Sequence, residues 1–330
     1  MYVYSLIPCL YDETGHHFIY HKTFSEALKI NNWKHIKYIP KECQIANLSK
    51  DWKRKLILHR GSKKKSLWNN FFKPFLNFFP FFKILWKIKK KRGEQEVLFL
   101  EYFTLAHLIA LFFAFFVVRP KCLLWLLYRT DLNQVILKGK AHKILHKLIM
   151  KTIGEKNLIF FTDSELLSEQ LETFFNKKFI VLPIPHVKVN IDKIETKKKK
   201  NLIFWWPGGS IREEKGLKYI KDLSKKLVTQ KNINLVIAKA AKELLDDNSN
   251  IKYVNTNLNF DEYNSLMVKS DIILLPYIAE FYRLRTSGIF VEAIAFGKIV
   301  VTTKNTWMAS ELEKFDLNEL IDKRKGSYFK

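Results

Sequence analysis

The 330-residue sequence predicts an α/β fold with two parallel-sheet domains. Short apolar runs, each the length of a buried strand, alternate with helical segments along most of the chain, and this alternation is typical of βα units. A polar, lysine-rich stretch at 187–200 interrupts the alternation and indicates a linker. We therefore expect an N-terminal domain over 1–188, a linker over 189–200, a C-terminal domain over 201–310 and a C-terminal tail helix over 311–330.

The apolar runs of the first half place its expected elements. The expected strands are Tyr2–Pro8, His35–Pro40, Lys55–His59, Val97–Tyr102, Cys122–Tyr128, Leu158–Thr162 and Phe179–Pro183. The expected helices run from the turn at Tyr11–His17 to Leu28, and over Leu105–Val118, Lys140–Thr152 and Ser164–Phe174. His142 and His146 lie one turn apart without a third metal ligand nearby, so we expect them to be surface histidines.

The apolar run Val97–Val118 is long enough to span a bilayer. Glu101 and His107 oppose that interpretation, because ionisable groups are costly in the middle of a membrane. A buried strand followed by a helix that ends before Pro120 explains the same residues, and we favour it.

The formal net charge of +25 indicates anionic partners, such as a nucleotide-sugar, a phospholipid, a pyrophosphate lipid or nucleic acid. Cys9, Cys43 and Cys122 are far apart, which argues against a disulfide framework or a metal knuckle and fits a reducing compartment. The N-terminal apolar stretch is too short for a signal peptide. These features predict a cytoplasmic protein without a bound metal.

A basic aromatic segment covers residues 53–92 and holds fourteen Lys or Arg but no Asp or Glu. Pro74 and Pro80 exclude one continuous helix. Aromatic and basic side chains together are typical of an interfacial membrane segment, and each cation near an anionic leaflet contributes about 1 kcal/mol. Binding of single-stranded nucleic acid and an ordinary core helix with a basic edge remain alternatives. The residues expected at the membrane are Lys63, Lys64, Lys65, Trp68, Phe71, Phe72, Phe75, Phe78, Phe79, Phe82 and Trp86.

The second half repeats the alternation of strands and helices. The expected strands are Leu202–Trp206, Asn234–Ala238, Ile272–Leu275 and Ile299–Thr302. The expected helices are Leu217–Leu227, Ala240–Leu245, Phe260–Val268 and Gly288–Phe296. The last helix is apolar almost all round, which predicts that it is buried.

Glu292 stands in the middle of that apolar helix, four residues after Gly288 and on the same face. Ser287 is a good N-cap, and the free amides at a helix N-terminus attract anions. A nucleoside diphosphate fits this order, with phosphate on the amides of Ser287 and Gly288 and ribose hydroxyls on Glu292. The alternative is a structural carboxylate held by a neighbouring lysine or backbone group.

These residues carry a family resemblance. Leu275–Tyr277 (LPY) and Ser287–Val301 (SGIFVEAIAFGKIVV) resemble the donor-binding domain of GT-B glycosyltransferases, most nearly the retaining family 4. The resemblance implies two Rossmann-like domains facing across a cleft. It also implies a donor site that includes Tyr277 and Thr286, where this loop offers Arg283 and Arg285 in place of a family carboxylate. The family's earlier glutamate falls at Leu284 here, so we expect the contacts with the donor sugar to differ from those of the family.

The stretch PGGSIREEKG, residues 207–216, follows an expected strand. Gly208 and Gly209 allow close backbone approach, and Arg212 and Lys215 provide two cations for a diphosphate. This stretch resembles the family's glycine turn, which implies that the two cations neutralise the leaving nucleotide diphosphate.

The first domain offers candidate acceptor-side residues at expected strand ends, where doubly wound sheets bind ligands. Gly15, His16 and His17 follow the first strand, and Arg129 and Asp131 follow another. Some GT-B enzymes have a similar turn facing the acceptor. We expect His16 and Asp131 to be catalytic, although a surface turn and a capping aspartate are the alternatives.

The sequence therefore predicts a glycosyltransferase that moves a sugar from a nucleotide-sugar to a lipid-linked or envelope glycan acceptor. Retention of configuration is implied by the resemblance alone. The expected location is the cytoplasmic face of a membrane, and no cofactor is expected. A nucleic-acid-binding protein and a catalytically silent membrane scaffold are the alternatives.

Overall fold

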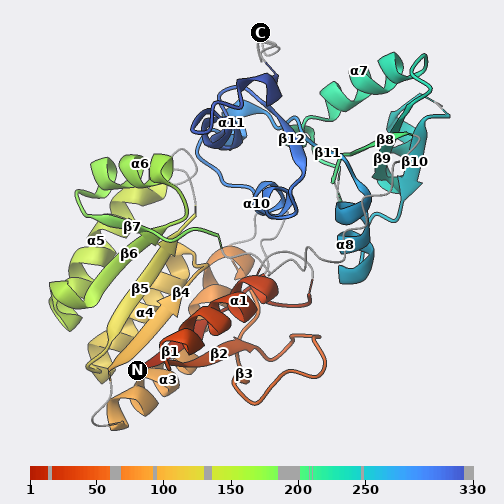
Figure 1. The fold of residues 1–330 in the computed structure, drawn as a ribbon. Coiled ribbons are helices and arrows are strands. Elements are labelled where there is room, and N and C mark those ends of the chain that lie inside the picture. The colour runs from red at the N-terminus through yellow and green to blue at the C-terminus, as the bar shows by residue number, and fades with distance from the viewer. Residues whose placement is uncertain are drawn as a thin grey trace. The chain divides into compact units, whose positions relative to one another are not determined.

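The structure is a computed structural model that describes residues 1–13, 17–59, 68–91, 95–129, 136–184, 201–207, 209, 211–246 and 249–322. It divides into two compact units, residues 1–185 and 186–330, and each is described here by itself (Figure 1). The linker predicted at 189–200 lies outside the described residues.

The N-terminal unit is built on a parallel sheet of seven strands in the order β3-β2-β1-β4-β5-β6-β7. Its central strands are apolar and buried, as expected where helices cover both faces of a parallel sheet. The strands are β1 (Tyr2–Leu6), β2 (Lys34–Pro40), β3 (Trp52–Leu56), β4 (Glu96–Leu100), β5 (Leu123–Tyr128), β6 (Leu158–Thr162) and β7 (Phe179–Val181).

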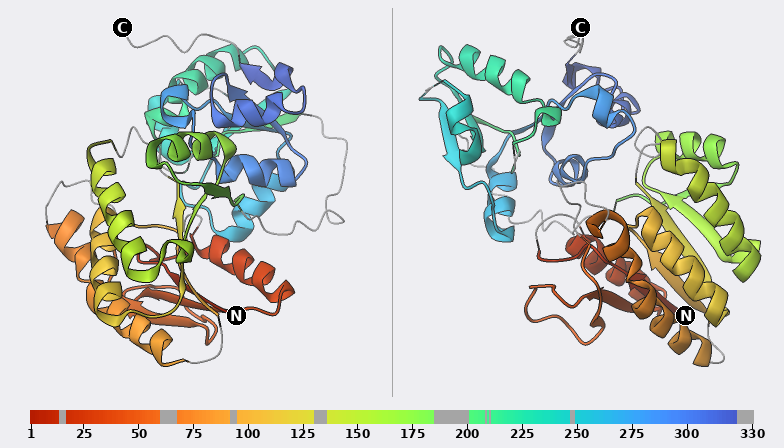
Figure 2. Two further views of the ribbon diagram at one scale, coloured as in Figure 1. Left: turned by 90° about the vertical axis from the view of Figure 1, so that its left-hand side faces the viewer. Right: turned by 180° about the vertical axis from the view of Figure 1, so that it is seen from behind.

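The helices of this unit connect successive strands. They are α1 (His17–Ile30), the π-helical turn η1 (Trp68–Phe72), α2 (Lys73–Phe75), α3 (Phe78–Lys90), α4 (Leu105–Val118), α5 (Ile136–Ile153), the 3₁₀ turn η3 (Glu155–Asn157) and α6 (Glu165–Phe175). Neighbouring α3, α4 and α5 pack side by side on one face of the sheet, and α1 covers the other (Figure 2). The predicted break near Pro74 is confirmed, whereas Pro80 is tolerated in the first turn of α3.

The C-terminal unit has a parallel sheet of six strands in the order β10-β9-β8-β11-β12-β13. The strands are β8 (Leu202–Trp205), β9 (Ile233–Ala238), β10 (Ile251–Val254), β11 (Ile272–Leu275), β12 (Ile299–Thr303) and β13 (Ile321–Asp322). The helices and 3₁₀ turns are η5 (Glu213–Lys215), α7 (Leu217–Leu227), η6 (Lys239–Leu244), α8 (Phe260–Lys269), α9 (Ala279–Tyr282), α10 (Gly288–Ala295), α11 (Trp307–Glu313) and η7 (Asn318–Leu320). The expected α/β fold with two parallel sheets is therefore confirmed.

Strand order reverses once in each sheet, between β1 and β4 and between β8 and β11. At such a point the connections leave in opposite directions, so a crevice opens beyond the carboxyl ends of the two strands. Each unit therefore has one place where the fold favours ligand binding, and both candidate sites described below lie there.

Several predicted elements of the C-terminal unit were wrong. Strand β10 was not expected, and residues 239–244 form a 3₁₀ segment rather than an α-helix. Over the described part of 311–330 there is no tail helix: α11 ends at Glu313, and the chain then adds β13 to the edge of the sheet. Helix α10 is only partly buried, because Phe290 and Ala293 face inward while Ile294 is exposed.

The two histidines of α5 are buried, not on the surface as predicted. Burial lowers the pKa of His146 to about 3, so the ring is neutral. Its Nε2 atom lies 2.7 Å from the hydroxyl of Tyr128, and its ring packs on Phe160 and Phe175. His142 shares this buried face because it lies one turn earlier on the same helix.

The long apolar run of the first half forms β4 and α4, as predicted. Thr104 caps α4, and its hydroxyl accepts the amide of His107 at 3.4 Å. Within the described part of the chain, no helix combines the length and apolar character needed to cross a bilayer.

A substitution of Gly216 would test how closely the C-terminal unit packs at this residue. Its φ is +84°, and a Cβ atom there would lie 1.9 Å from the carbonyl oxygen of Pro276. We expect Gly216→Ala to cost about 3 kcal/mol of unfolding free energy, from steric overlap added to left-handed strain. Urea unfolding followed by circular dichroism measures this.

Gly297→Ala is the matched control, because its φ is +65° but nothing lies within 4 Å of an added Cβ. It should cost only about 1 kcal/mol. Equal losses in the two variants would show that the contact with Pro276 is not tight.

Candidate functional site

The first candidate site begins in the turn after β8, residues 207–216, which we call the cationic turn. Gly208 lies outside the described residues, and Gly209 has a positive φ of 49°. The side chain of Arg212 forms an ion pair with Glu214, with 2.9 Å between Nη1 and Oε1. The indole Nε1 of Trp206 donates to the Lys215 carbonyl at 3.2 Å and fixes the backbone of the turn.

The cationic turn packs against the loop after β11, across the switch point of the sheet. The absent side chain of Gly216 lets its backbone meet Pro276. Two residues before Gly216 and two residues after Pro276, the amide of Ile278 donates to the Glu214 carbonyl at 3.0 Å. The two loops that carry the predicted donor-binding cations are therefore joined directly.

Helix α10 begins at this junction. Ser287 is its N-cap, and the hydroxyl accepts the amide of Phe290 at 3.3 Å. The next residue, Gly288, would meet no atom within 4 Å if it carried a Cβ. Open space therefore adjoins the first turn, whose leading amides have no partner within the helix. An anion can approach these amides closely.

Positive charge is concentrated beside that helix start. Burial lowers the pKa of Lys215 to about 8, and the charges of Arg212 and Arg285 act in the same direction against the opposing effect of Glu214. Arg285 also lies over the ring of Tyr282, with its guanidinium carbon 5.0 Å from the ring centroid. Three cations from two loops thus influence one another, as expected of an anion site.

Aromatic side chains pack beside these cations and the start of α10. The rings of Tyr277 and Tyr282 lie 4.4 Å apart between centroids. Burial raises the pKa of Tyr277, so its hydroxyl stays neutral, although Ser287, Arg212 and Arg285 oppose the shift. The half-buried Thr286 lies directly before the cap of α10.

Glu292 is held by a tyrosine from another helix. The hydroxyl of Tyr263, in α8, donates to Glu292 Oε2 at 2.5 Å. Burial raises the pKa of Glu292, and the hydrogen bond from Tyr263 opposes that shift. Neither a lysine nor a backbone group holds the carboxylate among the described residues, and Oε1 remains able to accept a hydrogen bond. The sequence did not predict the role of Tyr263.

Leu284 occupies the position where the resembled family carries its earlier glutamate. The side chain is buried, and it belongs to the loop between α9 and α10. Neighbouring Arg283 is exposed and shows no interaction with the described residues of the cationic turn. The described part of this loop therefore contributes cations and an apolar residue, but no carboxylate beside Glu292.

The second candidate site lies at the switch point of the N-terminal unit, around the carboxylate of Glu101, and we call it the Glu101 centre. Glu101 follows β4, and its side chain is 1% exposed. Arg129 Nη1 lies 2.5 Å from Oε1, His17 Nδ1 lies 3.2 Å from both carboxylate oxygens, and His21 Nε2 lies 3.0 Å from Oε2. Asp163, after β6, approaches Arg129 Nε at 3.6 Å.

Charges in the Glu101 centre compensate one another. Burial lowers the pKa of His21, although Glu101 opposes this, so His21 is neutral at pH 7. The pKa of Arg129 is raised by Glu101, Tyr20 and Asp163 despite its burial. His17 is 20% exposed and is the imidazole of this centre that an external ligand can reach.

The structure brings together two of the predicted acceptor-side residues, His17 and Arg129. His16, Gly15 and Asp131 lie outside the described residues, so their roles stay predictions. Sequence reasoning missed Glu101, His21 and Asp163 as site residues. The available signal was position, because Glu101 and Asp163 follow directly on apolar strands that end at the ligand-binding edge.

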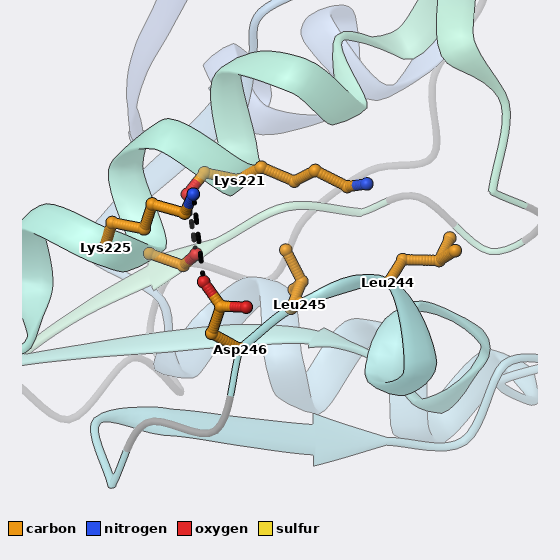
Figure 3. A pocket seen from close by; sticks show the side chains of 6 residues that line it. Lys221, Lys225, Leu244, Leu245 and Asp246 are labelled. Atoms are coloured by element: carbon orange, nitrogen blue, oxygen red, sulfur yellow. Dashed lines mark hydrogen bonds and ion pairs between the residues drawn. The ribbon is translucent and has the colours of Figure 1, made fainter.

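The predicted membrane residues lie on η1, α2 and α3, except Lys63, Lys64 and Lys65, which fall outside the described residues. Among the described residues, no three His, Cys, Asp or Glu side chains gather as they would around a metal ion. A surface pocket between α7 and η6 is lined by residues that belong to neither candidate site. There Lys225 and Asp246 face each other across 3.9 Å (Figure 3).

Comparison with known proteins gives matches only at the level of structure. No family model and no curated protein matches the sequence. The N-terminal domain of trehalose-6-phosphate phosphatase from Candida albicans superposes with a TM-score of 0.60 and 9% identity, over 94% of this chain and 84% of that one. An alpha-glucosyltransferase in complex with UDP-glucose and DNA containing an abasic site superposes with a TM-score of 0.57 and 10% identity, over 98% of this chain and 82% of that one.

The glycotransferase of kitacinnamycin gives a TM-score of 0.53 and 8% identity, over the whole of this chain and 87% of that one. The chain has the GT-B fold. This confirms the predicted fold class, and at these identities it shows the fold alone.

A substitution of Glu101 would test whether the Glu101 centre is held together by buried charges. Glu101→Gln would remove the charge that compensates Arg129, so we expect a loss of about 3–5 kcal/mol in unfolding free energy. Urea unfolding of the full chain measures it. Glu155→Gln is the control, because Glu155 pairs with Lys177 at the surface, and it should leave stability almost unchanged. Similar small losses in both would mean that Glu101 is not buried as an ion pair.

Proposed function

We propose that the protein is a glycosyltransferase that moves a sugar from a nucleotide-sugar to a lipid-linked or envelope glycan acceptor. The observation that carries the proposal is the meeting of Arg212, Lys215 and Arg285 beside the open first turn of α10. The likeness of the GT-B fold to sugar-transferring neighbours supports it. The resemblance of Ser287–Val301 to glycosyltransferase family 4 supports the same assignment.

The donor would lie with its diphosphate on the amides of α10 and between the three cations. Ribose hydroxyls would donate to Glu292, about one turn further along the helix, where Tyr263 holds the other oxygen. Among the groups whose charges act on one another here, the three cations outnumber the carboxylate of Glu214, and the excess of positive charge would favour a diphosphate. These fixed cations would stabilise the leaving group as its charge develops.

We propose that this electrostatic stabilisation needs neither a metal nor a cofactor, because the cations occupy the place where a metal would otherwise act. Retention of configuration is part of the proposal and rests on the family resemblance. The acceptor would bind near the Glu101 centre, where His17 is accessible. His16 and Asp131 remain proposed as catalytic residues, and the protein would work on the cytoplasmic face of a membrane.

The test is donor binding by the full chain. Thermal-shift measurements with UDP, GDP, ADP and CMP, free and sugar-linked, should show stabilisation by one nucleoside diphosphate, on the order of 2.7 kcal/mol at 100 times its Kd. Arg212→Ala and Lys215→Ala should each weaken this binding at least about tenfold and reduce donor turnover at least as much.

Lys226→Ala is the matched control, because it removes an exposed lysine from the last turn of α7 in the same unit. It should leave binding and turnover unchanged. Equal donor turnover in the wild type, Arg212→Ala and Lys215→Ala would contradict the proposal. A chain that binds single-stranded nucleic acid but no nucleotide would favour the nucleic-acid alternative, and one that binds only vesicles would favour a silent scaffold.

The lowered pKa of Lys215 predicts a pH dependence of donor binding. The ammonium group is charged below pH 8 and loses its proton as the pH rises through about 8. Nucleoside diphosphate binding favours the charged form, so affinity should fall by about tenfold between pH 7 and pH 9.5. Lys215→Arg keeps its charge throughout, so titration calorimetry should show a much weaker pH dependence for it. A steep fall that persists in Lys215→Arg would assign the titration to another group.

A further inference from the structure

An exposed apolar surface covers the outer side of the helical layer in the N-terminal unit. The solvent side of a helical layer ordinarily carries polar residues. Here η1, α3 and α4 present large apolar side chains that are 43–62% exposed. We call this surface the aromatic face. Its exposed members are Trp68, Phe72, Phe79, Trp86, Phe113, Phe116 and Val117.

The aromatic face is continuous across helices that are distant in sequence. Along α3, the rings of Phe78, Phe82 and Trp86 follow one another at centroid distances of 6.2 and 6.0 Å. Phe75 of α2 contacts Phe113 of α4 edge to face at 6.4 Å and joins the two rows. The face is therefore a property of the folded unit, and not of residues 53–92 alone.

Helix α4 is divided into two apolar sides. Leu108, Leu111 and Phe115 are fully buried within the unit. The opposite side carries Phe113, Phe116 and Val117, all exposed, and no charged residue until Arg119, which follows the helix. Since no described residue of the unit buries these three side chains, an apolar environment outside the described part of the unit would favour them.

Cations border the aromatic face, and acids are absent from it. Residues 68–91 and 102–121 contain no Asp or Glu. Lys83, Lys87 and Lys90 follow the outer side of α3 at helical spacing, beside its aromatic row. The ammonium groups of Lys89 and Lys90 lie 5.7 and 5.8 Å from the ring centre of Trp86. An occupant must therefore be apolar in its interior and anionic at its surface.

We propose that the aromatic face docks on an anionic phospholipid bilayer, with the outer side of α4 among the upper acyl chains and the lysines of α3 at the headgroups. Aromatic rings and lysines divided in this way suit the interfacial region of a bilayer. The biological sense of this inference rests on the proposed function, because a lipid-linked acceptor requires the enzyme at the lipid surface. Binding itself is measurable without turnover.

Single-stranded nucleic acid fits the face less well. Bases stack on free ring faces, but many of these rings already pack on one another, as Phe71 on Phe75 at 6.3 Å and Phe82 on Trp86 at 6.0 Å. Val117 and the outer rings of α4 offer no hydrogen bonds, and the guanidinium of Arg119 already lies over the ring of Phe116, 5.7 Å from its centre. Nucleic-acid binding is therefore kept as an outcome of the test.

The experiment is cosedimentation of the full chain with vesicles of phosphatidylcholine alone and with about one-third phosphatidylglycerol, at low salt and at about 0.5 M salt. We expect binding to the anionic vesicles. Phe113→Gln/Phe116→Gln should reduce the partition coefficient about tenfold at both salt concentrations, because apolar burial is insensitive to screening. Lys83→Gln/Lys87→Gln should reduce it about tenfold at low salt only.

Phe260→Gln is the matched control, since Phe260 is 53% exposed on α8 of the other unit, and it should bind vesicles like the wild type. Circular dichroism and the thermal shift with nucleoside diphosphate show that each variant is folded, and they separate failure of docking from failure of the proposed function. Wild-type vesicle binding by Phe113→Gln/Phe116→Gln overturns the proposal. Tight binding of a single-stranded oligonucleotide without vesicle binding overturns it also.

Discussion

The packing of Gly216 on the carbonyl of Pro276 is the contact on which the C-terminal site depends. It lets the turn after β8 meet the loop after β11 at the point where the strand order reverses. Without it, Arg212 and Lys215 would not share a corner with Arg285 and the start of α10. Burial lowers the pKa of Lys215, and the charges of Arg212 and Arg285 lower it further, so a bound anion would stabilise the charged form of this lysine.

The N-terminal unit has the same reversal of strand order but a different arrangement of charges beside it. Its sheet reverses at the same relative position, but the crevice end is closed by an internal ion network around Glu101 rather than left as an excess of positive charge. Removal of one partner from such a network is costly, which favours rigidity. One unit therefore offers an unbalanced, anion-seeking corner, and the other offers a balanced polar centre that exposes one imidazole, His17.

Local patterns were sufficient to predict most of the fold. Apolar runs with clear caps or breakers, such as Ile272–Leu275 before Pro276 and α10 between Ser287 and Gly297, were placed within a residue of their observed limits. The errors fall where tertiary contacts decide. Strand β10 is short and half-exposed, and β13 has two residues that exist as a strand only because β12 is beside them. His146 looked like a surface residue because its burial depends on Phe175 of α6 and Phe160 of the sheet.

The same distinction holds for the sites. The cationic turn and the start of α10 were recognisable because each carries its chemistry within ten residues. Tyr263 could not be paired with Glu292 from sequence, because they are 29 residues apart and meet only through the packing of α8. Glu101 was noticed as a charge in an apolar run, but its partners come from two further segments, α1 and the residue after β5, so its role emerged only in the folded unit.

The outer side of α4 has a consequence for the protein before it reaches any lipid. A newly made chain exposes Phe113, Phe116 and Val117 to water, and a second chain offers the nearest matching surface. Self-association and capture by chaperones then compete with delivery to the bilayer. The high positive charge counteracts this by mutual repulsion, so salt, which screens that repulsion, promotes aggregation of the free protein.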